Sequence, residues 1–184
     1  RLVVVLAAGV GQPAARWGVD HLIDGHRPRW LISAGYAGAL DPELNRNDLV
    51  APRSVLDGAG AEVVLDPSPF ESVPTVRVIP RLLLVDRVIT SGAEKAELRQ
   101  RHQADAIDME TFAAAVVARD RRVPLLSLRV VSDDARTDLP PEIGRMLNAS
   151  SGSYRVGAAL RALWGRPSAI KDFWNLHAHA MEAA

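Results

Sequence analysis

The feature that most constrains the fold is a helix followed closely by a buried strand in the second half of the chain. Residues 109–118 are mostly good helix formers, and Phe112, Val116 and Val117 recur at helical spacing. Residues 123–131 form a nearly continuous apolar run, which is typical of a strand that is buried on both faces of a sheet. The pair therefore indicates an α/β protein with strands in its interior.

The same kinds of element open the chain. Residues 2–6 are predicted to be a buried strand, residues 7–12 a turn, and the segment up to Gly25 an amphipathic helix before a second strand at residues 30–33. This order is the βαβ pattern of a parallel sheet. Gly9 and Gly11 in the turn could hold a phosphate group or could serve only the geometry of the turn.

Further strands are expected at residues 49–56, 62–65, 76–79 and 82–89, and a charged, mostly solvent-exposed helix at residues 93–102. The small-residue run at residues 33–39 is expected to be a loop, which either approaches a ligand closely or makes a tight turn. Residues 66–74 should form a proline-rich surface loop that either covers a pocket or only connects strands. Three helices are predicted in the tail, at residues 143–147, 156–164 and 170–181. Since no repeat or linker interrupts the chain, residues 1–184 are predicted to form a single domain.

Composition excludes several classes of function. The 22 basic and 22 acidic residues cancel, so no overall field attracts nucleic acid or an anionic membrane. The absence of cysteine excludes disulfides and thiolate metal sites. No apolar run approaches the roughly 20 residues of a membrane span. With 48% hydrophobic residues and a mean hydropathy of +0.01, the chain is expected to be a soluble, cytoplasmic protein with a sizeable core.

Acidic residues stand at both ends of the helix–strand unit. Asp108 and Glu110 lie at the start of the helix, and Ser132 and Asp133 follow the strand, which also carries Arg129. Ligands of open α/β sheets collect outside the carboxyl ends of the strands, so these residues are candidates for a functional site. Structural roles are the alternative: a helix N-terminal carboxylate for Glu110, an ion pair for Arg129, and a turn cap for Asp133.

Five segments resemble one known family in their order and approximate spacing. They are GVGQPAA (9–15), SAGYAGAL (33–40), NDLV (47–50), AIDMETFAAA (106–115) and VPLLSLRVVSDDA (123–135). The family is the nucleoside phosphorylase / methylthioadenosine–S-adenosylhomocysteine nucleosidase superfamily. In the tail, DLPPEIGRML (138–147) and RVGAALRALWGRPS (155–168) resemble a branch of hopanoid-biosynthesis-associated phosphorylases, which are thought to act on adenosylhopane.

The resemblance implies a fold and a reaction. The fold is a three-layer α/β/α sandwich around a mixed, partly barrel-like sheet. The reaction is cleavage of the N-glycosidic bond of a nucleoside, without a metal or cofactor, in a homodimer or higher homo-oligomer. The family also has an N-terminal strand and loop that contribute to the site, and we expect this chain to lack them before Arg1.

The resemblance also implies roles for individual residues. Asp133 would be the acid that protonates N7 of the purine, because a purine leaves poorly as an anion. Glu110 would accept hydrogen bonds from the ribose hydroxyls, and Arg129 would orient the nucleophile or a partner carboxylate. The other residues predicted to contact the substrate are Asp108, Met109, Ser132, Tyr36, Ala37, Gly38, Val88 and Ile89.

Two departures from the family pattern concern the nucleophile. Ser33 and Tyr36 stand where phosphorylases of the family have an arginine and a small hydroxyl residue that hold phosphate. Without that cation a phosphate dianion is poorly matched, so water is the expected nucleophile. The expected function is therefore hydrolytic release of adenine from a 5′-substituted nucleoside resembling methylthioadenosine or adenosylhopane. The alternatives are a phosphorylase with phosphate as co-substrate, and a non-catalytic nucleoside-binding protein of the same fold.

Overall fold

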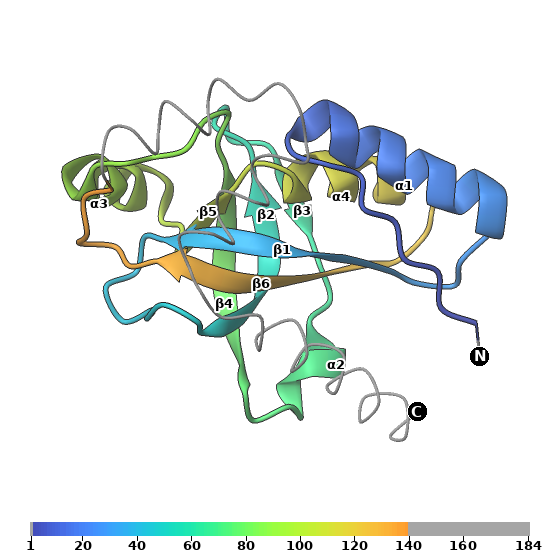
Figure 1. The fold of residues 1–184 in the computed structure, drawn as a ribbon, viewed down its shortest axis with the longest axis horizontal. Coiled ribbons are helices and arrows are strands. Elements are labelled where there is room, and N and C mark those ends of the chain that lie inside the picture. Colours follow the sequence, from blue (N-terminus) through green and yellow to red (C-terminus); the bar gives the residue numbers. More distant parts are fainter. Residues whose placement is uncertain (1, 140–184) are drawn as a thin grey trace.

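The computed structural model describes residues 2–139, which form a mixed sheet with helices around it (Figure 1). The strands are β1 (Leu31–Ala39), β2 (Leu49–Leu56), β3 (Glu62–Val64), β4 (Val76–Leu84), β5 (Ala106–Asp108) and β6 (Leu125–Asp133). The helices are α1 (Gln12–His26), α2 (Ser68–Glu71), α3 (Gly92–His102) and α4 (Thr111–Asp120).

The sheet closes on itself. Its strand order is β3-β2-β4-β5-β1-β6, and an additional pairing joins β2 to β6, so that β3 alone lies outside the ring. The pairs β2–β4, β4–β5 and β1–β6 are parallel, whereas β1–β5, β2–β6 and β2–β3 are antiparallel. The predicted class, an α/β fold around a mixed, partly barrel-like sheet, is confirmed.

Helices α1 and α4 lie side by side along the sheet, and the short α2 lies on the other side (Figure 1). Helix α1 buries Ala15, Val19 and Ile23, which confirms its predicted amphipathic stripe. Gly9 and Gly11 precede it with φ angles of 108° and 87°, a backbone region that glycine adopts without steric penalty. The glycines are therefore required by the turn itself.

The central helix–strand unit forms as predicted. The helix expected at residues 109–118 is α4 (Thr111–Asp120), and the strand expected at residues 123–131 is β6 (Leu125–Asp133). Helix α4 is buried along almost its whole length, and three consecutive alanines at residues 113–115 bring its backbone close to the core. The strands at residues 49–56 and 62–65 and the helix at residues 93–102 are also found, as β2, β3 and α3.

The strand predicted at residues 2–6 is wrong. This segment has no regular secondary structure, and its side chains are largely exposed, with Leu2 at 90% and Val5 at 68%. No strand of the described part of the chain pairs with it. An apolar run becomes a strand only where a partner strand supplies hydrogen bonds, and here none does.

The loop predicted at residues 33–39 is also wrong, because these residues continue strand β1. They pair with β6 in parallel along the run, and Gly38 also pairs with Ile107 of β5. The small residues serve close packing within the sheet. A Cβ atom at Gly38 would lie 3.2 Å from Cγ1 of Ile107, which is tighter than ordinary contact, and one at Gly35 would be in contact with Nη1 of Arg129 at 3.4 Å.

Two smaller corrections concern β4 and α2. The strands predicted at residues 76–79 and 82–89 are one strand, β4, which ends at Leu84. Pro80 does not break it. No residue pair of the β2–β4 register includes Pro80, and its backbone oxygen accepts a hydrogen bond of 3.4 Å from the Ser54 hydroxyl of β2. The predicted surface loop at residues 66–74 contains the short helix α2.

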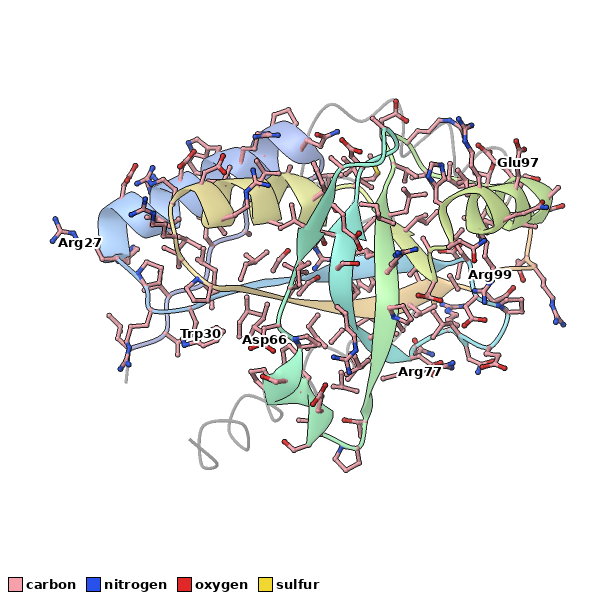
Figure 2. All side chains as sticks on the ribbon, turned by 180° about the vertical axis from the view of Figure 1, so that it is seen from behind. Arg27, Trp30, Asp66, Arg77, Glu97 and Arg99 are labelled. Atoms are coloured by element: carbon pink, nitrogen blue, oxygen red, sulfur yellow. The ribbon has the colours of Figure 1, made fainter. Side chains whose placement is uncertain are left out.

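Helix α3 is charged, and Glu97 stands on its outer side (Figure 2). Helix α3 is mostly exposed, as predicted, and Lys95 is its one buried residue. The three helices predicted in the tail lie outside the described residues. Among residues 2–139, none of the helices has the length and apolar character that a membrane span requires.

Candidate active site

A cavity of about 670 Å³ lies against β1, the ends of β5 and β6, and the segment that precedes α1. Every residue that was predicted from the sequence to act on the substrate lines it: Tyr36, Ala37, Gly38, Val88, Ile89, Asp108, Met109, Glu110, Arg129, Ser132 and Asp133. These residues come from widely separated parts of the chain. The closed sheet therefore brings the predicted site together at one place, while the role of each residue stays a prediction.

Glu110 is the last residue before α4 and is half-buried, but its side chain does not cap the helix. Its Oε1 instead accepts a hydrogen bond of 2.7 Å from the backbone N–H of Gly11, 99 residues earlier in the chain. Burial raises the pKa of the Glu110 carboxyl, and the charge of Asp108 raises it further, whereas the Gly11 N–H and Arg129 act in the opposite direction. The carboxyl group is thus fixed in orientation and weakly hydrated.

Arg129 uses all five of its N–H groups within the protein. Its Nε donates to Oδ2 of Asp108 at 2.9 Å, and its Nη1 donates to the backbone oxygens of Ser33 (2.9 Å) and Leu128 (3.2 Å). Its Nη2 donates to Oγ of Ser33 at 2.7 Å and to Oγ1 of Thr111 at 2.6 Å. Since a guanidinium has five N–H donors, none remains for a nucleophile. The geometry favours the structural ion pair, with Arg129 orienting Asp108.

Asp108 is the second half of that ion pair. Its carboxylate accepts hydrogen bonds from the backbone N–H of Thr111 at 3.0 Å and from the Thr111 hydroxyl, in addition to Arg129. Thr111 is the first residue of α4, so Asp108 links the start of this helix to β6. Because these bonds occupy the carboxylate, the geometry supports a structural role for Asp108 more than a contact with substrate.

Asp133 lies at the end of β6 with both carboxylate oxygens engaged. The Ser132 hydroxyl donates to Oδ1, and Nζ of Lys95 lies 2.5 Å from Oδ2. Sequence analysis missed Lys95, because it lies among exposed polar residues in α3. A weak signal was available in the composition. Lys95 is one of only two lysines in the sequence, and the other side chains that are always basic are arginines.

The basic residues that line the cavity are Arg87 and Arg129. Arg129 has no free N–H, as described above, and Arg87 forms an ion pair with Glu94 at 2.5 Å. Ser33, at the position of the family's phosphate-binding arginine, is itself held by Arg129. Within the described part of the chain, the cavity therefore offers no unpaired cation for a phosphate dianion. The same residues contain no group of three His, Cys, Asp or Glu side chains that could hold a metal ion.

The fold and the cavity define an α/β protein with a carboxylate-lined site for a small molecule. A family model of the phosphorylase superfamily matches residues 1–83 and 81–153, and the chain belongs to this superfamily. The predicted superfamily is thereby confirmed. A curated relative is the 5′-methylthioadenosine/S-adenosylhomocysteine nucleosidase of Tolumonas auensis, which is 27% identical over 188 residues, or 88% of this chain and 82% of the relative.

Solved structures support the fold. A methylthioadenosine nucleosidase mutant of Helicobacter pylori, with 5′-methylthioadenosine in its active site, matches with a TM-score of 0.64 at 17% identity, covering 83% of this chain and 77% of the other. A futalosine hydrolase mutant of the same organism matches with a TM-score of 0.60 at 17% identity, covering 67% of each chain. Both likenesses concern the fold alone.

Proposed function

We propose that the protein is a nucleosidase, which releases adenine from a 5′-substituted adenine nucleoside by hydrolysis of the N-glycosidic bond. One observation carries this proposal: two carboxyl groups with different surroundings, Asp133 and Glu110, line the same cavity. The two carboxyl groups belong to different elements, Asp133 to the end of β6 and Glu110 to the residue before α4. They can therefore serve the two sides of the glycosidic bond, one the base and the other the sugar.

In the proposed reaction Asp133 gives its proton to N7 of the purine. The electron pair of the bond between C1′ and N9 passes to the base, which leaves as neutral adenine, and the ribose becomes oxocarbenium-like. Glu110 accepts hydrogen bonds from the ribose hydroxyls, and its ionised form stabilises the positive sugar because little water screens it. A water molecule then adds to C1′ and releases a proton to solvent, and the Asp133 carboxylate takes up a proton from solvent, which restores the starting state. The proposed reaction uses no metal or organic cofactor.

The proposal of water rather than phosphate is supported by the cations at the cavity. Arg129 donates all its N–H groups to the protein, and Arg87 is paired with Glu94. A phosphate dianion binds best to a cation that no carboxylate already pairs. For the substrate, we propose an apolar 5′ substituent, as in methylthioadenosine or adenosylhopane. Apolar residues that line the same cavity, including Val10, Val88 and Leu139, support it.

The test is adenine release from methylthioadenosine and from an adenosine with a long apolar 5′ chain, each with and without phosphate. We expect equal release in both buffers, and a roughly 10²- to 10⁴-fold loss of kcat in Asp133→Asn. Asp134→Asn is the matched control. The Asp134 side chain does not line the cavity, and its oxygens accept hydrogen bonds from Thr137 and from the backbone of Arg136, which an asparagine can also accept in part.

Each other outcome supports one alternative. Release that depends on phosphate would identify a phosphorylase. Binding of the nucleoside without release of adenine would identify a binding protein of the same fold. Analytical ultracentrifugation of the same sample checks the further proposal that the protein is a homo-oligomer.

A further inference from the structure

Lys95 is the one fully buried lysine of the described residues, with 0% of its surface exposed. Its Nζ donates to Oδ2 of Asp133 at 2.5 Å and to the backbone oxygen of Asp134 at 2.6 Å. It does not itself line the cavity, which Asp133 does. Lysine is rarely buried, because removing an ammonium from water costs several kcal/mol unless it is paired, so this placement requires a compensating interaction.

We propose that Lys95 is a positioning residue for the catalytic acid: from behind the cavity it holds the Asp133 carboxyl group and stabilises the negative charge that appears there when the proton passes to the leaving base. This inference rests on the proposed function. The ammonium keeps its three hydrogens throughout. Asp133 loses one proton to the purine, and the electron pair of the glycosidic bond goes to the base.

The hydrogen bonds of Asp133 fit both of its charge states. Since Lys95 occupies Oδ2, the transferable proton belongs on Oδ1, next to the Ser132 hydroxyl. The oxygen of that hydroxyl also lies 3.0 Å from the backbone oxygen of Ala37. A hydroxyl has one hydrogen, so Ser132 can donate it to Ala37 while Asp133 is protonated and to Asp133 after the proton has left. Neither state leaves Oδ1 without a partner.

Other charged groups surround the acid less closely. Glu110, Asp108, Arg129 and Arg87 line the same cavity, but among residues 2–139 the ion pair of Asp133 is with Lys95 alone. Asp134 follows in the chain. The pKa of the Asp134 carboxyl is lowered mainly by the hydrogen bond from the Thr137 side chain, and Lys95 lowers it by a smaller amount. Removing Lys95 should therefore act mainly on Asp133.

The test compares Lys95→Met with Arg101→Met, which removes a positive charge from an exposed position of the same helix. Each variant is assayed on methylthioadenosine, whose base must be protonated, and on p-nitrophenyl riboside, whose leaving group needs no proton. We expect Lys95→Met to lower kcat on methylthioadenosine roughly 10- to 100-fold, with KM nearly unchanged, and to spare p-nitrophenyl riboside.

Equal losses on both substrates would show a purely structural role and overturn the inference. Arg101→Met should behave as the wild type. If circular dichroism shows that Lys95→Met does not fold, Lys95→Gln carries the same expectation, because it keeps a hydrogen-bond donor without the charge. Wild-type protein that cleaves neither substrate would refute the proposed function and the role of Lys95 together, whereas an active wild type isolates the test of Lys95.

Discussion

Arg129→Met should lower the free energy of unfolding by about 3–5 kcal/mol, because it leaves the Asp108 carboxylate buried without its cation. Arg129 is 2% exposed, and its Nε lies 2.9 Å from Asp108. The substitution also removes the donors to Ser33, Leu128 and Thr111. Domains of this kind have total stabilities of about 5–15 kcal/mol, so the effect is a large fraction of the whole.

Urea unfolding, followed by circular dichroism, measures this loss. With a slope of about 2 kcal/mol per molar urea, the midpoint should fall by about 2 M. Arg119→Met is the matched control, because Arg119 pairs with Asp120 at 2.9 Å on the surface, where the two side chains are 58% and 60% exposed. A surface pair of this kind should contribute less than about 1 kcal/mol.

A double-mutant cycle with Asp108→Asn decides whether charge is the cause. In the double variant no buried charge is left unpaired, so it should be more stable than the sum of the two single effects predicts, by about 2 kcal/mol. If the two effects simply add, the guanidinium does not compensate the charge of Asp108, and the reasoning about Arg129 as a structural ion-pair partner is refuted.

Two further predictions concern Glu110 and Gly92. Burial raises the pKa of Glu110 in the folded state, so its ionisation destabilises the fold as pH rises above the range in which the unfolded carboxyl titrates. Glu110→Gln should therefore be more stable than wild type at neutral pH. The difference in the free energy of unfolding should increase as pH rises from the acidic range and then become constant. A difference that does not change with pH in urea titrations would contradict this. Gly92→Ala should destabilise the protein by about 1–3 kcal/mol, because its Cβ would lie 2.8 Å from the backbone oxygen of Arg136, and an unchanged thermal midpoint would show that this segment moves aside freely.

The helix–strand unit at the centre of the site was predictable from sequence, because a buried helix or strand has apolar residues along its own short stretch of the chain. The helix formers of the alanine-rich run and the unbroken apolar run from Leu125 can each be recognised within a few residues. The acidic residues at their ends mark the place where such elements meet a ligand. Glu110 and Asp133 were found in this way, with the family resemblance supplying their roles.

Other features depend on partners that a local pattern does not contain. The predictions for residues 33–39 and for residues 2–6 were both wrong. The small-residue run at 33–39 forms a strand because β6 lies beside it, whereas the apolar run at 2–6 has no neighbouring strand to pair with. Pairing is a property of the folded sheet, so no periodicity reports it.

The sequence by itself determined the fold class, the main helices and strands, and which acidic residues lie at the ends of the elements that build the site. Only the tertiary structure decided their partners: Gly11 bonds Glu110 across 99 residues, and Lys95 bonds Asp133 across 38. The physical reason is that the sequence alone predicts a charged helix residue to be solvent-exposed. Only the closed sheet shows that an opposite charge lies against it. Burial of an ion pair is settled by the balance between desolvation and pairing, and both depend on the three-dimensional neighbours of the two groups.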